Sequence, residues 1–106
     1  ETFEKIDALI TPVWPYPLPT IEESDLGANP EATQMVLKSG HNTRPVNYLG
    51  FPAVNLPIGF DRNGLPTSVQ LIGAPYTEEK LLRIARTVER ELNFWSVQPR
   101  LSVFTK

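Results

Sequence analysis

The clearest hydrophobic pattern of the chain lies in its last third. Between residues 77 and 92, apolar side chains recur at three- and four-residue steps along one stripe, with charged residues between them. The stripe consists of Leu81, Leu82, Ile84, Ala85, Val88 and Leu92. Thr77 is a favourable N-cap residue, and Glu78 and Glu79 lie in the first turn, where the helix dipole favours acids. The pattern predicts one amphipathic helix over residues 77–92.

Two segments before this helix have the two-residue period of β-strands. Residues 53–60 alternate apolar with smaller or polar side chains, and in residues 67–73 one face carries Val69 and Leu71. The other face of this second segment carries Ser68, Gln70 and Ile72. A short Asn-Gly turn separates the segments, so we expect an antiparallel hairpin. Pro57 favours an edge strand, a bulge or a broken strand, because proline cannot donate a ladder hydrogen bond.

The first part of the chain predicts a strand followed by a stiff segment. Residues 7–12 read as a short strand buried on both faces, because residues 8–10 are consecutively apolar. Four prolines alternate with Trp14 and Tyr16 in residues 12–19, which predicts an extended, polyproline-like segment that packs onto the body of the protein.

The middle of the chain is more polar. Residues 20–34 are acidic and predict a mobile surface loop, to which residues 34–37 could add a helical turn. Thr43 as N-cap, Pro45 in the first turn and Gly50 as a left-handed C-terminal cap predict a short helix. At the other end of the chain, we expect Phe94-Trp95 and Pro99-Arg100-Leu101 to pack against a neighbouring surface.

Composition indicates one ordinary globular domain. The 106 residues are 41% hydrophobic and 21% charged, and the net charge of -2 offers no basic field for a nucleic-acid partner. Cysteine is absent and His41 is the single histidine, which excludes disulfides, a Cys nucleophile and a multi-histidine metal site. Apolar runs are far shorter than a membrane helix needs, and no signal peptide is visible, so we expect a cytoplasmic protein without a membrane partner.

The residues themselves indicate no self-contained active site. A nucleophilic triad needs a nucleophile, a base and a group that orients the base. The neighbours of His41, Asn42 and Thr43, do not form a nucleophile elbow, and the acids cluster where solvation explains them. The glycines do not form a phosphate-binding pattern. From its residues alone, the chain is a small α/β unit.

Three segments of the chain resemble the C-terminal part of the amidase signature family. They are residues 7–12, residues 42–60 and residues 64–75, which include the Gly-Leu-Pro and Gln-Leu-Ile-Gly strings. Three residues of the predicted last helix also match: Glu79, Leu82 and Glu89. The matches follow the order and spacing of the family and span nearly the whole chain.

The resemblance implies a fold and a reaction. Members of this family hydrolyse carbon–nitrogen amide bonds with a Ser–cis-Ser–Lys triad, on a large α/β/α fold around a mixed sheet. The resemblance implies that residues 1–106 are a single unit, the C-terminal segment of such a domain and thus a fragment of a longer chain. Its short mixed sheet would contain the hairpin of residues 53–60 and 67–73, covered by the helix over 77–92. No cofactor or metal is implied.

No catalytic residue is carried over to this chain by the resemblance. The triad lies upstream of the matched part in the family, and the serines here are scattered, with no Gly/Ser-rich run. They are Ser24, Ser39, Ser68, Ser96 and Ser102. We therefore expect the chain to supply sheet, helix and pocket wall to a parent enzyme, and to be inactive alone.

The resemblance also points to substrate contacts. They would come from Trp14 in the proline-rich segment and from Gly40, His41, Asn42 and Thr43. In the glutamine-using aminoacyl-tRNA amidotransferases, the A-type subunits carry an Asp three residues before the threonine that matches Thr43, and an acid there could bind a substrate ammonium group. Gly40 stands at that position, which favours a hydrolase of a small-molecule amide over the amidotransferase branch.

Two alternatives stay open at this point. One is a stand-alone α/β binding or interaction module, and the other is a fragment of a noncatalytic amidotransferase A-type subunit. If the chain is a segment, residues 8–10 and one face of the hairpin lose their covering elements. Exposed apolar surface of this kind drives association, so we expect the isolated chain to self-associate.

Overall fold

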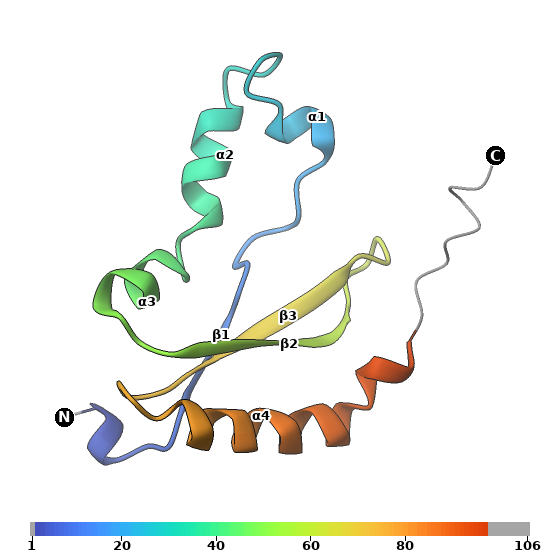
Figure 1. Ribbon diagram of the computed structural model, residues 1–106. Coiled ribbons are helices and arrows are strands. Elements are labelled where there is room, and N and C mark those ends of the chain that lie inside the picture. The colour runs from blue at the N-terminus through green and yellow to red at the C-terminus, as the bar shows by residue number, and fades with distance from the viewer. Residues whose placement is uncertain (1, 98–106) are drawn as a thin grey trace.

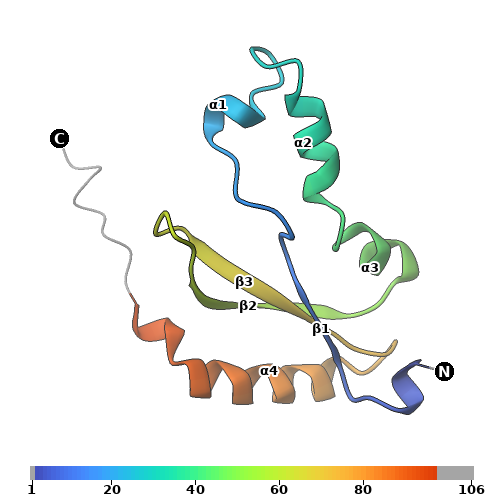
Figure 2. The ribbon, with the colours of Figure 1, turned by 180° about the vertical axis from the view of Figure 1, so that it is seen from behind.

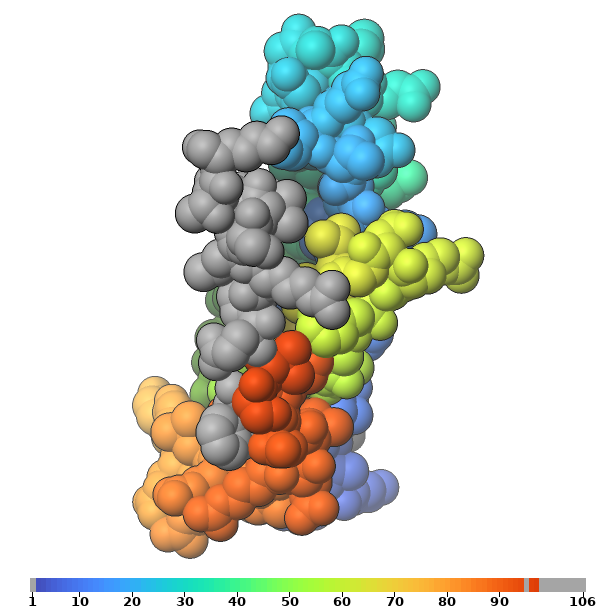
Figure 3. Space-filling view, turned by 90° about the vertical axis from the view of Figure 1, so that its right-hand side faces the viewer, coloured from blue at the N-terminus to red at the C-terminus, as the bar shows by residue number. Residues whose placement is uncertain are grey.

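The computed structural model describes residues 2–97, which form a three-stranded sheet with helices on both sides. The elements in chain order are η1 (Thr2–Glu4), β1 (Leu9–Pro12), α1 (Ile21–Ser24), α2 (Ala32–Ser39), α3 (Arg44–Leu49), β2 (Ala53–Phe60), β3 (Pro66–Ile72), α4 (Glu78–Leu92) and η2 (Phe94–Ser96). The helix α4 lies along one face of the sheet, and α1 to α3 lie on the other side (Figures 1 and 2). Figure 3 shows α1 and α2 at one end of the molecule and α4 at the other.

The sheet has the order β1-β3-β2, with β3 in the centre. The predicted hairpin is confirmed as β2 and β3, and the register shifts between Pro57 and Gly59. Pro57 thus lies both on an edge strand and at an irregularity of the ladder, two of the features its position predicts. The expectation of a mixed sheet is wrong for residues 2–97, because β1 and β2 each pair with β3, and both ladders are antiparallel.

One face of the sheet, which we call the covered face, packs against α4. Its core consists of Leu56, Leu71, Leu81 and Ala85, all buried. Burial of a leucine side chain contributes about 1.5–3 kcal/mol, so this cluster is a main source of stability. The predicted helix is confirmed as α4, with a narrower buried stripe than expected, since Leu82 is 60% exposed and Leu92 is 41% exposed.

The cap predicted at Thr77 is not formed as expected. Thr77 is the N-cap residue by position, but its side chain makes no capping bond to α4. Its hydroxyl instead donates to the Ala74 carbonyl at 2.7 Å. This bond stabilises the turn between β3 and α4 rather than the first helical N–H groups.

The strand predicted over residues 7–12 forms as β1, but it is not buried on both faces. Leu9 is 41% exposed and Ile10 is 59% exposed. The reason is position, because β1 is an edge strand and α4 packs on β2 and β3. The apolar run at β1 is therefore covered only in part, since Ala8 packs against the core under α4 while Leu9 and Ile10 stay exposed.

The prediction of a surface loop over residues 20–34 is wrong at its two ends, where helices form, and agrees with the exposed turns of residues 25–31. The segment contains α1 and the start of α2, which spans Ala32–Ser39 and exceeds the single turn expected at residues 34–37. A capping box begins α1: the Glu23 N–H donates to Thr20 Oγ1 at 3.2 Å, and the Thr20 N–H donates to Glu23 Oε2 at 2.8 Å. The Thr-x-x-Glu spacing is the signal that the acidic composition obscured.

The remaining segments agree in part with the sequence. The short helix is confirmed as α3, and Gly50 ends it with φ of 67°. Thr43 precedes α3 but has helical backbone angles and makes no side-chain cap. Bends interrupt the extended segment expected at residues 12–19, where Trp14 Nε1 donates to the Pro17 carbonyl at 3.2 Å.

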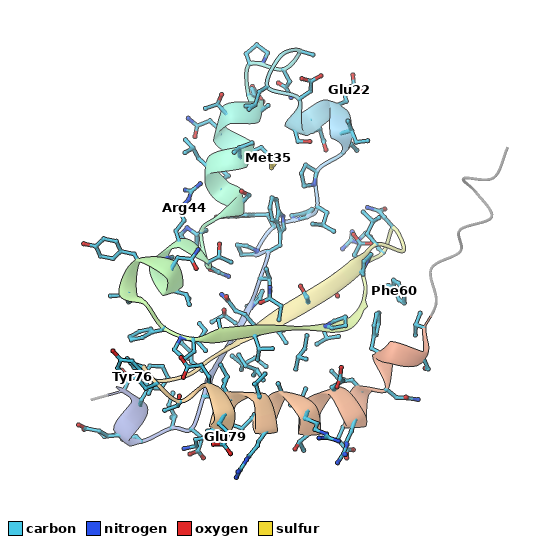
Figure 4. The ribbon with its side chains drawn as sticks, viewed as in Figure 1. Glu22, Met35, Arg44, Phe60, Tyr76 and Glu79 are labelled. Atoms are coloured by element: carbon cyan, nitrogen blue, oxygen red, sulfur yellow. The ribbon has the colours of Figure 1, made fainter. Side chains whose placement is uncertain are left out.

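The end of the described chain packs on the hairpin. The Phe94 ring lies 5.2 Å from the Phe60 ring, centroid to centroid, and Figure 4 shows Phe60 beside η2. This contact agrees with the packing expected for Phe94. The expectation for residues 99–101 lies outside the described residues.

Candidate functional site

The face of the sheet opposite α4, which we call the open face, borders a cavity of about 520 Å³. The cavity lies between β1, β3, η1 and α3. Its apolar lining consists of Phe3, Leu9, Pro45, Val46, Leu49, Phe51 and Ile72. Its polar lining consists of Thr2, Thr11, His41 and Asn42. A cavity of this size with a few polar groups is typical of a binding site for a small organic molecule.

Local sequence features shape the apolar wall. Gly50 adopts the left-handed conformation and turns the chain at the end of α3, and the Phe51 N–H then donates to the Val46 carbonyl at 3.1 Å. Phe51 meets Phe3 edge to face, with ring centroids 5.5 Å apart. The two rings close one side of the cavity, so the wall depends on the glycine that ends α3.

The polar side of the cavity is built on a buried glutamine. Gln70 is 2% exposed, and its Nε2 donates to Thr11 Oγ1 and to the Asn42 carbonyl, both at 2.9 Å. Asn42 Nδ2 donates to the Pro12 carbonyl at 2.7 Å. These bonds join β1, β3 and the segment before α3, and they leave His41 exposed at the cavity.

The structure brings together some of the residues expected to contact substrate. His41 and Asn42 both line the cavity. Trp14 lines a second cavity of about 230 Å³ instead. Gly40 and Thr43 flank the His41-Asn42 pair in sequence and line neither cavity. The five residues therefore do not form one surface.

Gly40 has a local structural role. A Cβ atom at this position would lie 2.6 Å from Arg44 Nε. The guanidinium of Arg44 folds back on the end of α2, where Nη1 donates to the Leu37 carbonyl at 2.8 Å and Nη2 donates to the Val36 carbonyl at 3.3 Å. Figure 4 shows Arg44 at the junction of α2 and α3. The small residue leaves room for a cation that satisfies the last carbonyls of α2.

The hydroxyl groups of three serines take part in local backbone contacts. Ser24, Ser39 and Ser96 each donate to a carbonyl three or four residues earlier. Ser68 lines the second cavity, and Ser102 lies outside the described residues. Within residues 2–97, no group of three or more acidic or histidine side chains is placed to hold a metal ion, and no helix is both long and apolar enough to cross a membrane.

Sequence reasoning missed three residues that shape the site. The strand alternation correctly places Gln70 on the face opposite Leu71, but the partners of Gln70 come from segments far away in the chain. No feature of the sequence pattern indicates the roles of Thr11 and Arg44. The available hint for Gln70 is a long polar side chain in the middle of an apolar strand, where burial requires hydrogen-bond partners.

Comparison with known proteins identifies the family. The sequence pattern of the Amidase family matches residues 1–82, and the chain therefore belongs to this family. A fatty acid amide hydrolase of Medicago truncatula is 39% identical over 93 residues, and one of Oryza sativa subsp. indica is 40% identical over 92 residues. The A-type subunit of a glutamyl-tRNA(Gln) amidotransferase from Myxococcus xanthus is 38% identical over 93 residues.

The aligned region is most of this chain but a small part of each relative. They cover 84–88% of this chain, but only 15–18% of the length of the three relatives. Relatives of two kinds match with nearly the same identity, so identity does not separate the hydrolase branch from the amidotransferase branch. The site residues are needed to choose between them.

Proposed function

We propose that this chain contributes sheet, covering helix and part of the substrate-facing wall to a hydrolase of carbon–nitrogen amide bonds. The observation that supports this most is the family match together with the small share of each relative that the chain covers. In this proposal, the serine nucleophile and its lysine partner belong to polypeptide outside these 106 residues. The serine hydroxyl attacks the amide carbonyl, and its proton passes through lysine to the amine, which leaves as the carbon–nitrogen bond breaks. Water then hydrolyses the acyl ester and frees the serine, and backbone N–H groups stabilise the oxyanion in both steps.

The wall in this proposal is the cavity on the open face. His41 and Asn42 lie where the polar lining meets the apolar lining. An uncharged amide would place its apolar part against Phe51 and Ile72 and its polar part toward His41. Trp14 would contribute only the apolar part of its indole to a separate contact, because its Nε1 already donates to the Pro17 carbonyl.

Gly40 and Arg44 support the choice of a hydrolase over a glutamine-using amidotransferase. Residue 40 offers no carboxylate that could hold a substrate ammonium group. The Arg44 side chain instead crosses this position. Neither residue lines the cavity, so the support from this position is the lack of an acid that could hold an amino acid amine, not a contact with the substrate.

The test uses the intact protein that carries this chain. It is incubated with neutral amides and anilides of increasing acyl length, and the released amine is measured. His41→Ala is expected to raise KM about tenfold, which corresponds to about 1.4 kcal/mol of lost binding. Tyr48→Ala is the matched control, because Tyr48 is 90% exposed on α3 and does not line the cavity. Release of no amine from any of these substrates would contradict the proposal.

Two further measurements separate the alternatives. The 106-residue chain alone is expected to release no amine, and turnover that disappears when one of its serines is replaced would place the active site within it. Mass spectrometry of the natural protein tests the stand-alone binding module, since a complete protein of 11.9 kDa would contradict the hydrolase proposal.

A further inference from the structure

The buried side-chain amide of Gln70 donates both of its hydrogens to segments that are distant in the sequence. Gln70 lies in the middle of the central strand and is 2% exposed, whereas the other buried residues in the described part of the chain are apolar or glycine. A side-chain amide group carries two donor hydrogens. One goes to Thr11 Oγ1 on β1 and the other to the Asn42 carbonyl. Such a buried and satisfied group has one preferred orientation, because any other leaves a donor unpaired.

Asn42 makes a second hydrogen bond to the sheet, through its side chain, at the β1 edge. The Val13 N–H donates to the Ser68 carbonyl, so the backbone groups of Val13 point toward β3. Backbone groups alternate in direction along a strand, and those of Pro12 therefore point away from β3. Asn42 Nδ2 donates to this outward carbonyl at 2.7 Å. The side chain of Asn42 thus takes the place that a further strand would occupy at this point of β1.

These bonds are the connection between the sheet and residues 40–43. Among the hydrogen bonds of residues 2–97, the two that join this segment to the sheet are those made by Gln70 and by the Asn42 side chain. Residues 41–43 form a turn without regular structure. Backbone bonds join the same residues to α2 and α3, so this pair of contacts is what fixes them relative to the sheet.

We propose that Gln70 is a positioning residue, which acts through Asn42 to hold His41 at the rim of the substrate cavity. The proposal rests on the proposed function, since the cavity is taken as the substrate wall. Gln70 does not line the cavity itself. Its contribution is to fix where the polar rim lies relative to the apolar wall.

The first test measures amide hydrogen exchange in the intact protein that carries this chain. Gln70→Met keeps the length of the side chain and removes both donors. It is expected to raise the exchange of the residue 41–43 amides about tenfold, with a much smaller change in α4, because the lost contacts are local. Gln34→Met is the matched control, since Gln34 is exposed on α2 and makes no side-chain hydrogen bond within the described residues. Unchanged exchange at residues 41–43 would overturn the proposal.

The second test measures amide hydrolysis with the same variants. Gln70→Met is expected to raise KM several-fold while kcat changes little, because the residue acts on the position of the binding wall. Faster exchange with an unchanged KM would overturn the positioning role and leave amide hydrolysis standing. If the intact protein hydrolyses no amide, the proposed function fails, and the exchange measurement still decides whether Gln70 holds the segment.

A pair of milder substitutions keeps the proposal testable if Gln70→Met does not fold. Asn42→Asp keeps the size of the side chain but cannot donate to the Pro12 carbonyl. Asn55→Asp is its control, because Asn55 lies beside Gln70 in the sheet register and is exposed. We expect faster exchange at residues 41–43 in Asn42→Asp alone, and equal exchange in both variants would contradict the proposal.

Discussion

Leu71 and Gln70 are neighbours on β3, yet they face opposite sides of the sheet and are buried in different ways. Leu71 is 4% exposed and packs in the apolar core under α4. Gln70 is 2% exposed and is held by hydrogen bonds to β1 and to the segment before α3. The covered face is stabilised by non-directional burial, and the open face by a few directional bonds beside a cavity. Under the proposed function, stability and substrate recognition therefore lie on opposite faces of one strand.

The largest effect is expected on the covered face. Leu81 is 3% exposed, and Leu81→Ala is expected to reduce the free energy of unfolding by about 2–5 kcal/mol, through lost burial and the cavity that remains. Leu82 is 60% exposed on the same helix, and Leu82→Ala should cost less than about 1 kcal/mol. Urea denaturation of both variants measures the difference. Similar losses for the two leucines would show that α4 does not pack as described.

The covered face can be predicted from the sequence, and the open face cannot. Periodicity places Leu71 and Leu81 on one side because helix and strand spacing are local properties. The partners of Gln70 are 28 and 59 residues away, and no local pattern specifies them. The burial predicted for β1 is too high for a similar reason. A run of apolar residues does not indicate which elements will cover it. Family resemblance places His41 and Asn42 at a binding site, and their role there stays a prediction.

The two edges of the sheet also differ, in how well each is protected against pairing with a strand of another molecule. The β2 edge carries Pro57 and an irregular register, which hinder pairing with another strand. The β1 edge is blocked at Pro12 by the Asn42 side chain, but two residues earlier it presents the exposed Ile10, whose backbone groups also point away from β3. We therefore propose that two copies of the isolated chain associate through β1.

Sedimentation velocity of the isolated chain tests this association. Ile10→Lys is expected to weaken it at least tenfold, or about 1.4 kcal/mol, because the lysine charge would be buried between the copies. Ile58→Lys on β2, where Ile58 is 42% exposed, is the control and should leave the association unchanged. A monomer at high concentration of the unmodified chain would contradict the proposal.

A smaller effect is expected from the contact between Thr11 and Gln70. Thr11→Val keeps the shape of the side chain but removes the acceptor for one Gln70 hydrogen. The expected loss in the free energy of unfolding is about 1 kcal/mol, typical of one buried hydrogen bond. Thr33→Val is the control, because Thr33 is exposed on α2. If thermal unfolding shows the same loss for both, the polar network does not contribute to the stability of the open face.

The smallest effect is expected at α1, which lies on the same side of the sheet as the open face but outside the apolar core and the hydrogen bonds of Gln70. Thr20→Ala removes the acceptor of the Glu23 N–H, and loss of such a cap costs about 0.5–1 kcal/mol. Because α1 has no buried residue, this loss should appear as faster amide exchange at residues 23 and 24 and leave the global unfolding midpoint unchanged. Thr33→Ala serves as the control. A shift of the global midpoint in Thr20→Ala would mean that α1 is coupled to the sheet, and the separation of the molecule into a stabilising face and a recognition face would then be incomplete.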